Sequence, residues 1–510
     1  MDPIRKIVVA GGGTAGWMAA GALAARFNPN TSSGIKVVLV EAPDIATIGV
    51  GEGTWPSMRD TLQAMGIAES DFLTSCDASF KQASRFQDWL RPGHAYYHPF
   101  MAPRRFDELN LAEVWSETAK AGDFADFVSF QPALCDQDRA PKMASTPDFE
   151  PIANYAYHLD AGKFADFLKA HCLNRLGVDH ISGRIAAVRT DNDDYITALA
   201  LDDGRDVDGD LFLDCTGFHA LLIGKHYGAP VTDVKDQLFV DTALAMQVPY
   251  DDGDPIRSST CSTAQPAGWI WDIGLQSRRG TGYVYSSAFT SEDEARATLS
   301  AYIGKGPEYG ERARRIGINS GYRPTPWIKN CVAVGLSMGF VEPLEASSIV
   351  MIELALKDLM DRMPASRADM PALARGFNTT FAGRWAAIVD FLKLHYLLSQ
   401  RDEPFWAANR DMATVSSGLG ELLELWKTRT PGVADFPHRA EIFPAASYQY
   451  VLYGMEYQTR MPAWRSLRRD LRKTELARDE VERARTSVGR LPTNRAFFDA
   501  LTARRDAIRA

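Results

Sequence analysis

An α/β fold is predicted for this chain of 510 residues by three observations. A short apolar strand at Ile7 to Ala10 leads into a glycine-rich turn and an alanine-rich helix. A second apolar strand, IKVVLVE, follows that helix. Apolar strands then continue to alternate with helical segments to about residue 360. This alternation is typical of a parallel sheet covered by helices.

The first turn carries the spacing GxGxxG, which predicts a dinucleotide-binding loop. The first glycine permits the tight turn, the second lets a pyrophosphate approach the backbone, and the third lets helix and strand pack closely. The pyrophosphate is expected at the N-terminus of the helix, where free N–H groups favour an anion. A glycine-rich turn without a ligand is the alternative. The predicted contacts are Gly11, Gly13, Thr14, Ala15, Gly16 and Glu41, the last ending the second strand where ribose hydroxyls are bound.

Later segments are typical of the rest of a Rossmann-type FAD-binding module of the flavin monooxygenase kind. VDGDLFLDCTGFHALLI is an apolar strand that runs into a small-residue turn. KNCVAVGLSMGFVEPLEASSIVMIELALKDLM is a strand, a glycine-containing turn and a long amphipathic helix. Gly49 and Leu336 are further predicted cofactor contacts.

The composition changes along the chain, which predicts two modules. Residues 1–365 are expected to form the FAD-binding module, with an active-site loop region at about residues 80–150. Residues 366–510 are expected to form a helix-rich substrate or capping module, with aromatic residues at helical spacing in RWAAIVDFLKLHYLL. The highly charged segment near the C-terminus predicts a solvated amphipathic helix.

Composition argues against several classes of protein. The net charge is −9 and no basic patch accompanies the aromatic residues, so nucleic acid is not an expected partner. The six cysteines form no CxxC pair, and neither a metal site nor a disulfide framework is expected. No apolar run is long enough to span a membrane, and a strand begins within a few residues of Met1. A cytoplasmic location is therefore expected.

Three further motifs, taken in order along almost the whole chain, resemble the flavin-dependent tryptophan halogenases. They are VGEGTWPSMRDTL followed by FKQASRFQDW, then GWIWDIG, then GFVEPLEASSI. The resemblance implies that Lys81 is the catalytic lysine and that Glu345 is the catalytic glutamate facing it in the substrate pocket. A desolvated amine is a nucleophile that can capture or hydrogen-bond hypohalous acid. The alternatives are a surface lysine and an acid that only stabilises a helix N-terminus.

The resemblance also assigns a barrier and a halide site. Trp269, Trp271 and Ile273 match the family signature WxWxIP, whose tryptophans separate the flavin from the organic substrate; Gly274 replaces the proline. Two aromatic residues on one face of a strand would also produce this spacing. Ser347 and Ser348 stand where the family has Thr-Gly beside the halide. The added Cβ at position 348 is expected to alter halide binding.

Four residues are implied to contact the substrate. His98 and Phe100 match residues that flank the indole, although a single histidine is often structural. Tyr450 and Glu456 match loosely the residues that grip the amino-acid group of free tryptophan, and Gln449 stands where a tyrosine is expected. This departure suggests free indole, a larger indole-bearing molecule or a peptide as substrate.

Together these matches imply FADH2- and O2-dependent halogenation of an indole or tryptophan-like ring through hypohalous acid, with bromide favoured over chloride. The chain has no second GxGxxG in a comparable context, so a separate NADH-dependent flavin reductase is expected to supply the reduced cofactor. A homodimer is compatible with the family. Two other functions stay open, namely an aromatic monooxygenase and a flavin-binding sensor without turnover.

Overall fold

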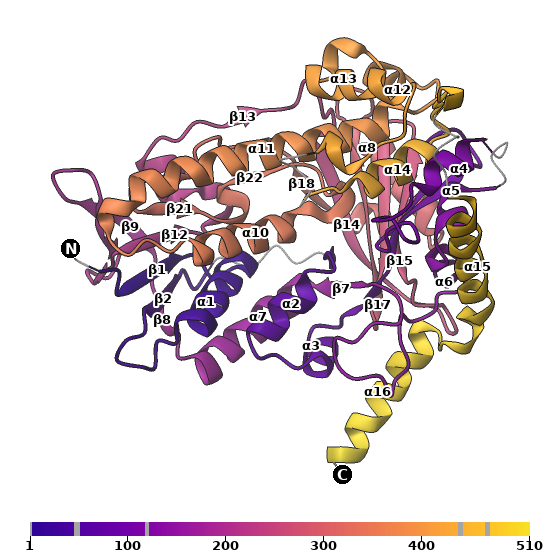
Figure 1. Cartoon of the computed structure of the whole chain (residues 1–510). Coiled ribbons are helices and arrows are strands. Elements are labelled where there is room, and N and C mark those ends of the chain that lie inside the picture. Colours follow the sequence, from indigo (N-terminus) through magenta and orange to yellow (C-terminus); the bar gives the residue numbers. More distant parts are fainter. Residues whose placement is uncertain (1–2, 45–50, 118–121, 437–441, 465–469, 510) are drawn as a thin grey trace. The chain divides into compact units, whose positions relative to one another are not determined.

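The structure is a computed structural model, and it describes residues 3–44, 51–117, 122–436, 442–464 and 470–509 (Figure 1). Contacts divide the chain into two compact units, each assembled from three segments. The first unit comprises Met1–Ala78, Leu159–Asp233 and Asn319–Trp385, and the second comprises Ser79–His158, Val234–Ile318 and Ala386–Ala510. The expected module boundary near residue 365 falls within the third segment of the first unit. The division into residues 1–365 and 366–510 stays a prediction.

A six-stranded sheet forms the centre of the first unit, in the order β20-β21-β12-β1-β2-β8. Its strands are β1 (Lys6–Ala10), β2 (Lys36–Glu41), β8 (Asp179–Ser182), β12 (Leu211–Asp214), β20 (Trp327–Ile328) and β21 (Cys331–Ala333). All neighbours pair in parallel except β20 with β21. The sheet grows from β1 toward β2 and β8 on one side and toward β12 and β21 on the other. This reversal of strand order places a ligand at the carboxyl end of β1.

Helices and small sheets complete the first unit. Helix α1 (Thr14–Phe27) packs on α7 (Ala161–His171) and on α10 (Ser347–Asp361). Figure 1 shows these helices beside the sheet. The remaining helices are α2 (Met58–Ala64), α3 (Glu69–Ser75) and the π-helices Cys172–Leu176 and Leu221–His226. The remaining strands are β3 (Gly51–Gly53), β9 (Ile185–Thr190), β10 (Ile196–Leu201), β11 (Asp206–Asp208), β13 (Thr232–Asp233), β19 (Gly321–Tyr322) and β22 (Gly339–Phe340). The predicted α/β class is confirmed in this unit.

A seven-stranded sheet forms the centre of the second unit, in the order β18-β14-β17-β16-β15-β5-β6. Its strands are β5 (Ala83–Gln87), β6 (Ala95–Pro99), β14 (Thr242–Pro249), β15 (Ser259–Gln265), β16 (Gly268–Gly274), β17 (Arg278–Tyr285) and β18 (Arg314–Gly317). Neighbouring strands are antiparallel except β5 with β15. Antiparallel strands need only short connections, so this part of the chain does not repeat the strand–helix alternation of the first unit.

Helices cover this sheet. On one face, α8 (Glu292–Ile303) and α9 (Glu308–Arg312) pack on β14. The other helices are α4 (Leu111–Glu117), α5 (Phe124–Val128), α6 (Gln131–Asp136), α12 (Pro404–Asn409), α13 (Ser417–Trp426), α14 (Ala445–Gly454), α15 (Leu471–Ser487) and α16 (Asn494–Arg509). Helix α11 (Met370–Leu397) carries the aromatic residues predicted at helical spacing.

Residues 80–150 contain β5, β6 and α4 to α6, although a loop region was expected there. Most residues of β5 and β6 are buried, which is consistent with their pairing into the sheet. The proline-bearing tracts MAPRRF and STPDFEP within it are turns and irregular backbone. The charged segment near the C-terminus forms α15 and α16, and Ala477 of α15 is buried against the second unit's aromatic cluster.

Candidate active site

The glycine loop after β1 has the shape that a pyrophosphate requires. A Cβ on Gly11 would lie 2.3 Å from the carbonyl oxygen of Cys215, and a Cβ on Gly16 would lie 1.8 Å from that of Gly11. A Cβ on Gly13 would meet nothing within 4 Å. The outer two glycines thus permit close packing, and the middle one borders open space. Thr14 and Ala15 begin α1, which has no side-chain cap and no acid in its first turn, so its N–H groups suit an anion.

Glu41 ends β2 beside this loop, as expected. Oε2 of Glu41 accepts hydrogen bonds from Nζ of Lys169 at 2.6 Å and from Nε2 of His180 at 3.0 Å. Oε1 would lie 2.3 Å from a Cβ on Gly12, so only glycine fits there. The Oε1 atom therefore faces the loop and is placed to accept from a ribose hydroxyl. The residues present fit the adenosine half of FAD.

Asp214, at the end of β12, was not singled out from the sequence. Its buried carboxylate accepts from the backbone N–H of Thr216 at 3.0 Å and from those of Leu222 and Ile223 at 2.8 Å. It thereby fixes the turn that packs on Gly11. An aspartate that ends the apolar strand LFLD was the signal in the sequence.

Leu336 lies in a 3-10 turn, Gly335–Ser337, next to the glycine loop. A Cβ on Gly335 would lie 2.7 Å from Cβ of Ala15, and Gly335 has φ +73°. Ser337 donates a hydrogen bond to the carbonyl oxygen of Asp214. The turn is therefore anchored beside α1. Gly49, the other predicted cofactor contact, lies outside the described residues.

Glu345 is held in a constrained backbone. It has φ +61° and Ala346 has φ +54°, both in the left-handed region that side-chain-bearing residues rarely adopt. The indole N–H of Trp55 donates to the carbonyl oxygen of Glu345 at 2.8 Å and holds this conformation. Side chains in such strained segments occur often at functional sites. Glu345 is 7% exposed, so its carboxylate lies in a largely dry environment.

Ser347 and Ser348 are the first two residues of α10, which begins directly after this strained pair. The helix has no side-chain cap and no acid in its first turn. Ser347 is buried and Ser348 is half-buried. Free N–H groups at the start of a helix of 15 residues attract an anion through hydrogen bonding and the helix dipole. The predicted halide site has suitable local chemistry, and its role stays a prediction.

A buried acid that sequence reasoning missed lies further along α10. Glu353 accepts hydrogen bonds from the hydroxyls of Ser57, at 2.9 Å, and Thr61. Burial raises the pKa of Glu353 from 4.5 to about 7, and the two hydroxyls oppose this shift. The contact joins α10 to the segment that carries Trp55. A glutamate at a position of the helix that faces apolar neighbours was the signal in the sequence.

We expect Glu353→Gln to stabilise the protein above pH 7. The folded-state pKa of Glu353 is raised, so the folded protein binds a proton that the unfolded chain releases. Stability is therefore lost as the pH rises from about 4.5 through about 7. Glutamine carries no charge to desolvate, and we expect the free energy of unfolding at pH 8 to rise by about 1–3 kcal/mol.

Urea unfolding of both proteins between pH 5 and 8 measures this difference. The exposed acid of the same helix, Asp361, serves as the control, and Asp361→Asn should show no such gain above pH 6. A constant difference between Glu353→Gln and the parent protein across this range would show that Glu353 is ionised throughout.

Lys81 is buried in β4 (Ser79–Lys81) of the second unit. Its side chain is 1% exposed, and Nζ lies 5.2 Å from the centroid of the Phe100 ring. Strand β4 pairs with β7 (Ala156–Asp160), which places Ser79 opposite His158. Burial, and next the charge of Lys81, hold the pKa of His158 well below its usual value. A neutral imidazole therefore lies near the lysine, and the sequence YAYHLD had not identified it as a site residue.

The predicted barrier residues share one face of the seven-stranded sheet. Trp269, Trp271 and Ile273 alternate along β16, and the two indole rings lie 6.5 Å apart, centroid to centroid. A Cβ on Gly282 would lie 2.1 Å from the Trp271 ring, so the partner strand leaves space for that ring only because it has glycine there. Trp269 is 1% exposed. The two tryptophans share a face, as their spacing indicates, and their role as a barrier stays a prediction.

The same face carries His98 and the region beside Lys81. His98 pairs with Ser84, and Ser84 pairs with Thr260, so their side chains point to the same side of the sheet. Thr260 alternates with Ser262, which pairs with Trp271. Nε2 of His158 lies 2.8 Å from the hydroxyl of Thr260. The register thus brings His98 and the tryptophan pair to one side of the sheet, and His158, whose pKa the charge of Lys81 lowers, reaches that side at Thr260.

His98 and Tyr450 are in contact with other protein groups. Nε2 of His98 lies 2.9 Å from the hydroxyl of Ser447, and its ring centroid lies 6.0 Å from that of Tyr450. The hydroxyl of Tyr450 donates to the carbonyl oxygen of Met101 at 2.8 Å. Both side chains are buried. These contacts orient the two rings.

The carboxylate of Glu456, predicted to bind the amino group of a substrate, is already paired with an arginine. Arg91 donates to both of its carboxylate oxygens, from Nη1 at 2.9 Å and from Nη2 at 2.6 Å. Gln449 donates to Pro431 and Asn110. The amide of Gln449 and the carboxylate of Glu456 thus already have protein partners. Whether Tyr450 and Glu456 contact the substrate stays a prediction.

A unit that fits FAD, together with a sheet that carries a buried lysine and a tryptophan pair, defines a flavin-dependent oxidoreductase. The chain matches the tryptophan halogenase family over residues 6–467. It belongs to that family of flavin-dependent halogenases.

Relatives of this chain include proteins of known structure. It is 35% identical to the tryptophan 6-halogenase SttH of Streptomyces toxytricini, over 97% of this chain and 98% of SttH. A tryptophan halogenase from Shewanella frigidimarina has 42% identity and a TM-score of 0.94, with 98% of each chain covered. BrvH, a flavin-dependent halogenase from Brevundimonas sp. BAL3, has 34% identity and a TM-score of 0.86, over 98% of this chain and 99% of BrvH. Both structures support the mixed α/β fold.

All six cysteines are described, and each is buried and outside any disulfide. Within the described ranges, no three metal-ligating side chains cluster. In the same part of the chain, no helix has both the length and the apolarity needed to cross a membrane.

Proposed function

We propose that this protein halogenates an indole-type ring, with Lys81 directing the electrophilic halogen. FAD in its reduced form, with O2 and a halide, would supply the oxidising chemistry that produces hypohalous acid. The observation that carries the proposal is the buried amine of Lys81, 1% exposed, beside Phe100 and near His158, which contacts Thr260 of the sheet that carries the tryptophan pair.

Lys81 would restrain a diffusible oxidant. Once it has lost its proton, its amine can attack hypohalous acid to form an N–halogen bond and water; as an ammonium group it can hold the acid by hydrogen bonding. The electron-rich ring then attacks the halogen, and the nitrogen recovers the bonding electron pair and takes up a proton, which restores the amine. We propose that Glu345 takes the proton that the ring loses. The tryptophan pair would keep the ring away from the flavin.

The contacts of Glu456 and Gln449 favour a substrate whose amino-acid group is not gripped there. A carboxylate whose charge is already balanced by a guanidinium attracts an ammonium group less strongly than an unpaired carboxylate does. Free indole, or an indole carried by a larger molecule, fits this better than free tryptophan. Several relatives are named as tryptophan halogenases, so tryptophan is the comparison substrate.

We expect bromination to be faster than chlorination at equal halide concentrations. Ser348 adds a Cβ at the start of α10, where the family has glycine beside the halide. Bromide is more easily oxidised than chloride. It is also less strongly hydrated, so its desolvation costs less free energy. A competition assay with both salts and one indole measures the ratio of the two products.

Ser348→Gly is the informative variant for this expectation. It should increase the chlorinated fraction, because it removes the added Cβ at the helix N-terminus. Predominantly chlorinated product from the parent protein would show that Ser348 leaves the halide site intact.

An aromatic monooxygenase is the second candidate function, because it requires the same FAD-binding fold. It needs neither a buried lysine nor a tryptophan barrier, and it usually binds NAD(P)H itself. Bleaching of the bound flavin by NADH alone would support it. We propose instead that a separate NADH-dependent reductase supplies reduced FAD.

The test is incubation of the protein with a flavin reductase, NADH, FAD, air and each halide in turn against a panel of indoles. Mass spectrometry should detect a ring-halogenated product with the isotope pattern of bromine or chlorine. Omission of the reductase should abolish it. A product that gains oxygen instead of halogen would contradict the proposal and would favour the monooxygenase.

A further inference from the structure

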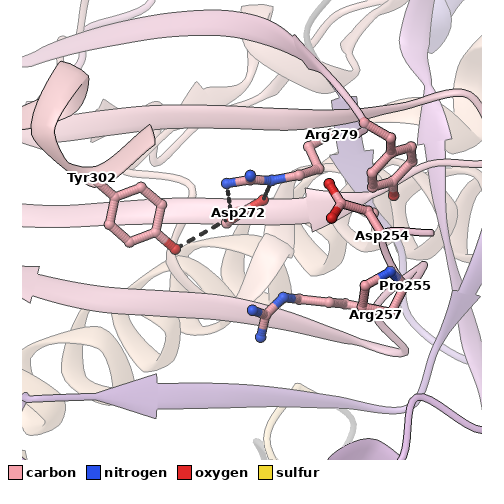
Figure 2. A pocket seen from close by; sticks show the side chains of 8 residues that line it. Asp254, Pro255, Arg257, Asp272, Arg279 and Tyr302 are labelled. Carbon is pink, nitrogen blue, oxygen red and sulfur yellow. Dashed lines mark hydrogen bonds and ion pairs between the residues drawn. The ribbon is translucent and has the colours of Figure 1, made fainter. Parts of the chain in front are cut away.

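The face of the seven-stranded sheet opposite the tryptophan pair contains a cavity of about 350 Å³. Asp272 and Gly274 line it and alternate along β16 with Trp271 and Ile273, so their side-chain positions point to the other side of the sheet. Tyr302 of α8, the helix that covers this face, also lines the cavity (Figure 2). This volume lies in the range of small-molecule sites and exceeds what a single ion needs.

One part of the cavity wall is internally neutralised and rigid. Arg279 donates to both oxygens of Asp272, at 3.1 and 2.5 Å, and the hydroxyl of Tyr302 donates to Asp272 at 3.3 Å (Figure 2). Tyr250 donates its hydroxyl to the carbonyl oxygen of Leu275 at 2.9 Å. Two phenol rings are therefore fixed in place by their hydroxyls, and they offer flat surfaces to a ligand.

Two opposite charges in the same cavity form no direct ion pair among the described residues, although the carboxylates of Asp272 and Asp138 act on Arg257 from a greater distance. Among the described residues, the guanidinium of Arg257 has one hydrogen-bond partner, Sγ of Cys261 at 3.4 Å, and no carboxylate within ion-pair distance. The carboxylate of Asp254 accepts from the backbone N–H of Asp251 at 3.0 Å, and no cationic side chain of the described chain pairs with it. Figure 2 shows Asp254 and Arg257 without a bond to any other residue drawn.

The position of Asp254 is set by its backbone. Nε of Arg495, on α16, donates to the carbonyl oxygen of Asp254 at 2.6 Å, and the guanidinium of Arg495 lies 4.9 Å from the Tyr250 ring centroid. Asp254 and Arg257 are three residues apart in the chain, yet their charged groups remain separated. A ligand that carries one negative and one positive group would satisfy both.

We propose that this cavity binds an α-amino acid with a ring-bearing side chain, at a site apart from the sheet face that carries Trp269 and Trp271. The guanidinium of Arg257 would bind the carboxylate in bidentate geometry, and Asp254 would accept from the ammonium group. Tyr250 and Tyr302 would contact the ring.

Binding of L-phenylalanine to the purified full-length protein, followed by titration calorimetry, tests this site without any need for turnover. Two analogues separate the charges, because 3-phenylpropionate lacks the ammonium group and phenethylamine lacks the carboxylate. We expect saturable binding of L-phenylalanine, and weaker binding of each analogue.

The variants Arg257→Gln and Asp254→Asn should then show a crossed pattern. Arg257→Gln should lower the affinity for L-phenylalanine and for 3-phenylpropionate by about tenfold or more, and should leave the affinity for phenethylamine unchanged. Asp254→Asn should lower the affinity for L-phenylalanine and for phenethylamine, and should leave the affinity for 3-phenylpropionate unchanged. Arg312→Gln, at an exposed arginine on α9, is the matched control and should bind like the parent protein.

Absence of saturable binding by L-phenylalanine would overturn the proposal, as would binding that neither variant weakens. Equal loss of all three probes in both variants would also overturn it, because that result indicates a general change of structure. Circular dichroism of each variant identifies such a change independently.

Discussion

Lys81→Ala is expected to abolish halogenated product while FAD binding and NADH consumption by the coupled reductase continue. The buried amine is the group proposed to hold the electrophilic halogen, so its loss should lower the rate of ring halogenation by on the order of 10³-fold or more. Product formation under single-turnover conditions with excess reduced FAD measures this loss. Lys81→Arg should fail as well, because a guanidinium stays protonated and forms no N–halogen bond.

Lys427→Ala is the matched control, since Lys427 is an exposed lysine of the same unit with 57% side-chain exposure. It should retain the parent activity. Full halogenation by Lys81→Ala would mean that the lysine only packs against Phe100, and the proposed role would be wrong.

Glu345→Gln is expected to slow halogenation by about 10²-fold, since glutamine cannot accept the proton released from the ring. The substitution keeps the size of the side chain and leaves the backbone bond from Trp55 to residue 345 intact. The variant should therefore bind FAD and unfold at the same temperature as the parent protein. Initial rates with one indole and saturating halide provide the measurement.

Glu421→Gln, at an exposed glutamate of α13, controls for the loss of one negative charge. Its rate should match that of the parent protein. If Glu345→Gln also stays within a factor of two, Glu345 serves as a helix-terminus acid, which was the alternative interpretation of its position.

The FAD-binding fold was predictable because its signals are local. The strand before Gly11, the glycine spacing and the acid at Glu41 follow one another within one βαβ unit, and each has a direct backbone consequence. The seven-stranded sheet was not predicted as such, because β5 pairs with β15 across more than 150 residues of sequence, and β6 joins the sheet only through β5. No local pattern encodes that pairing.

The residues of the candidate site fall into two groups, those that local motifs predict and those whose importance only the folded structure reveals. Lys81, His98 and the tryptophan pair were predicted from motifs, and sheet register explains why His98 and the tryptophan pair share a face. Asp214 and His158 were missed because their importance comes from contacts with distant segments. The pairing of Glu456 with Arg91 could not be predicted either, because the two residues are 365 positions apart in the sequence.

The central claim is that Lys81 directs an oxidised halogen that the protein has already produced. It is tested most directly by adding a soluble β-diketone that traps hypohalous acid to the coupled assay with bromide and indole, and comparing the parent protein with Lys81→Ala. We expect the parent protein to produce brominated indole. We expect Lys81→Ala to produce brominated trap and no brominated indole. Equal bromination of the indole by both proteins would contradict it, as would a variant that forms no brominated trap.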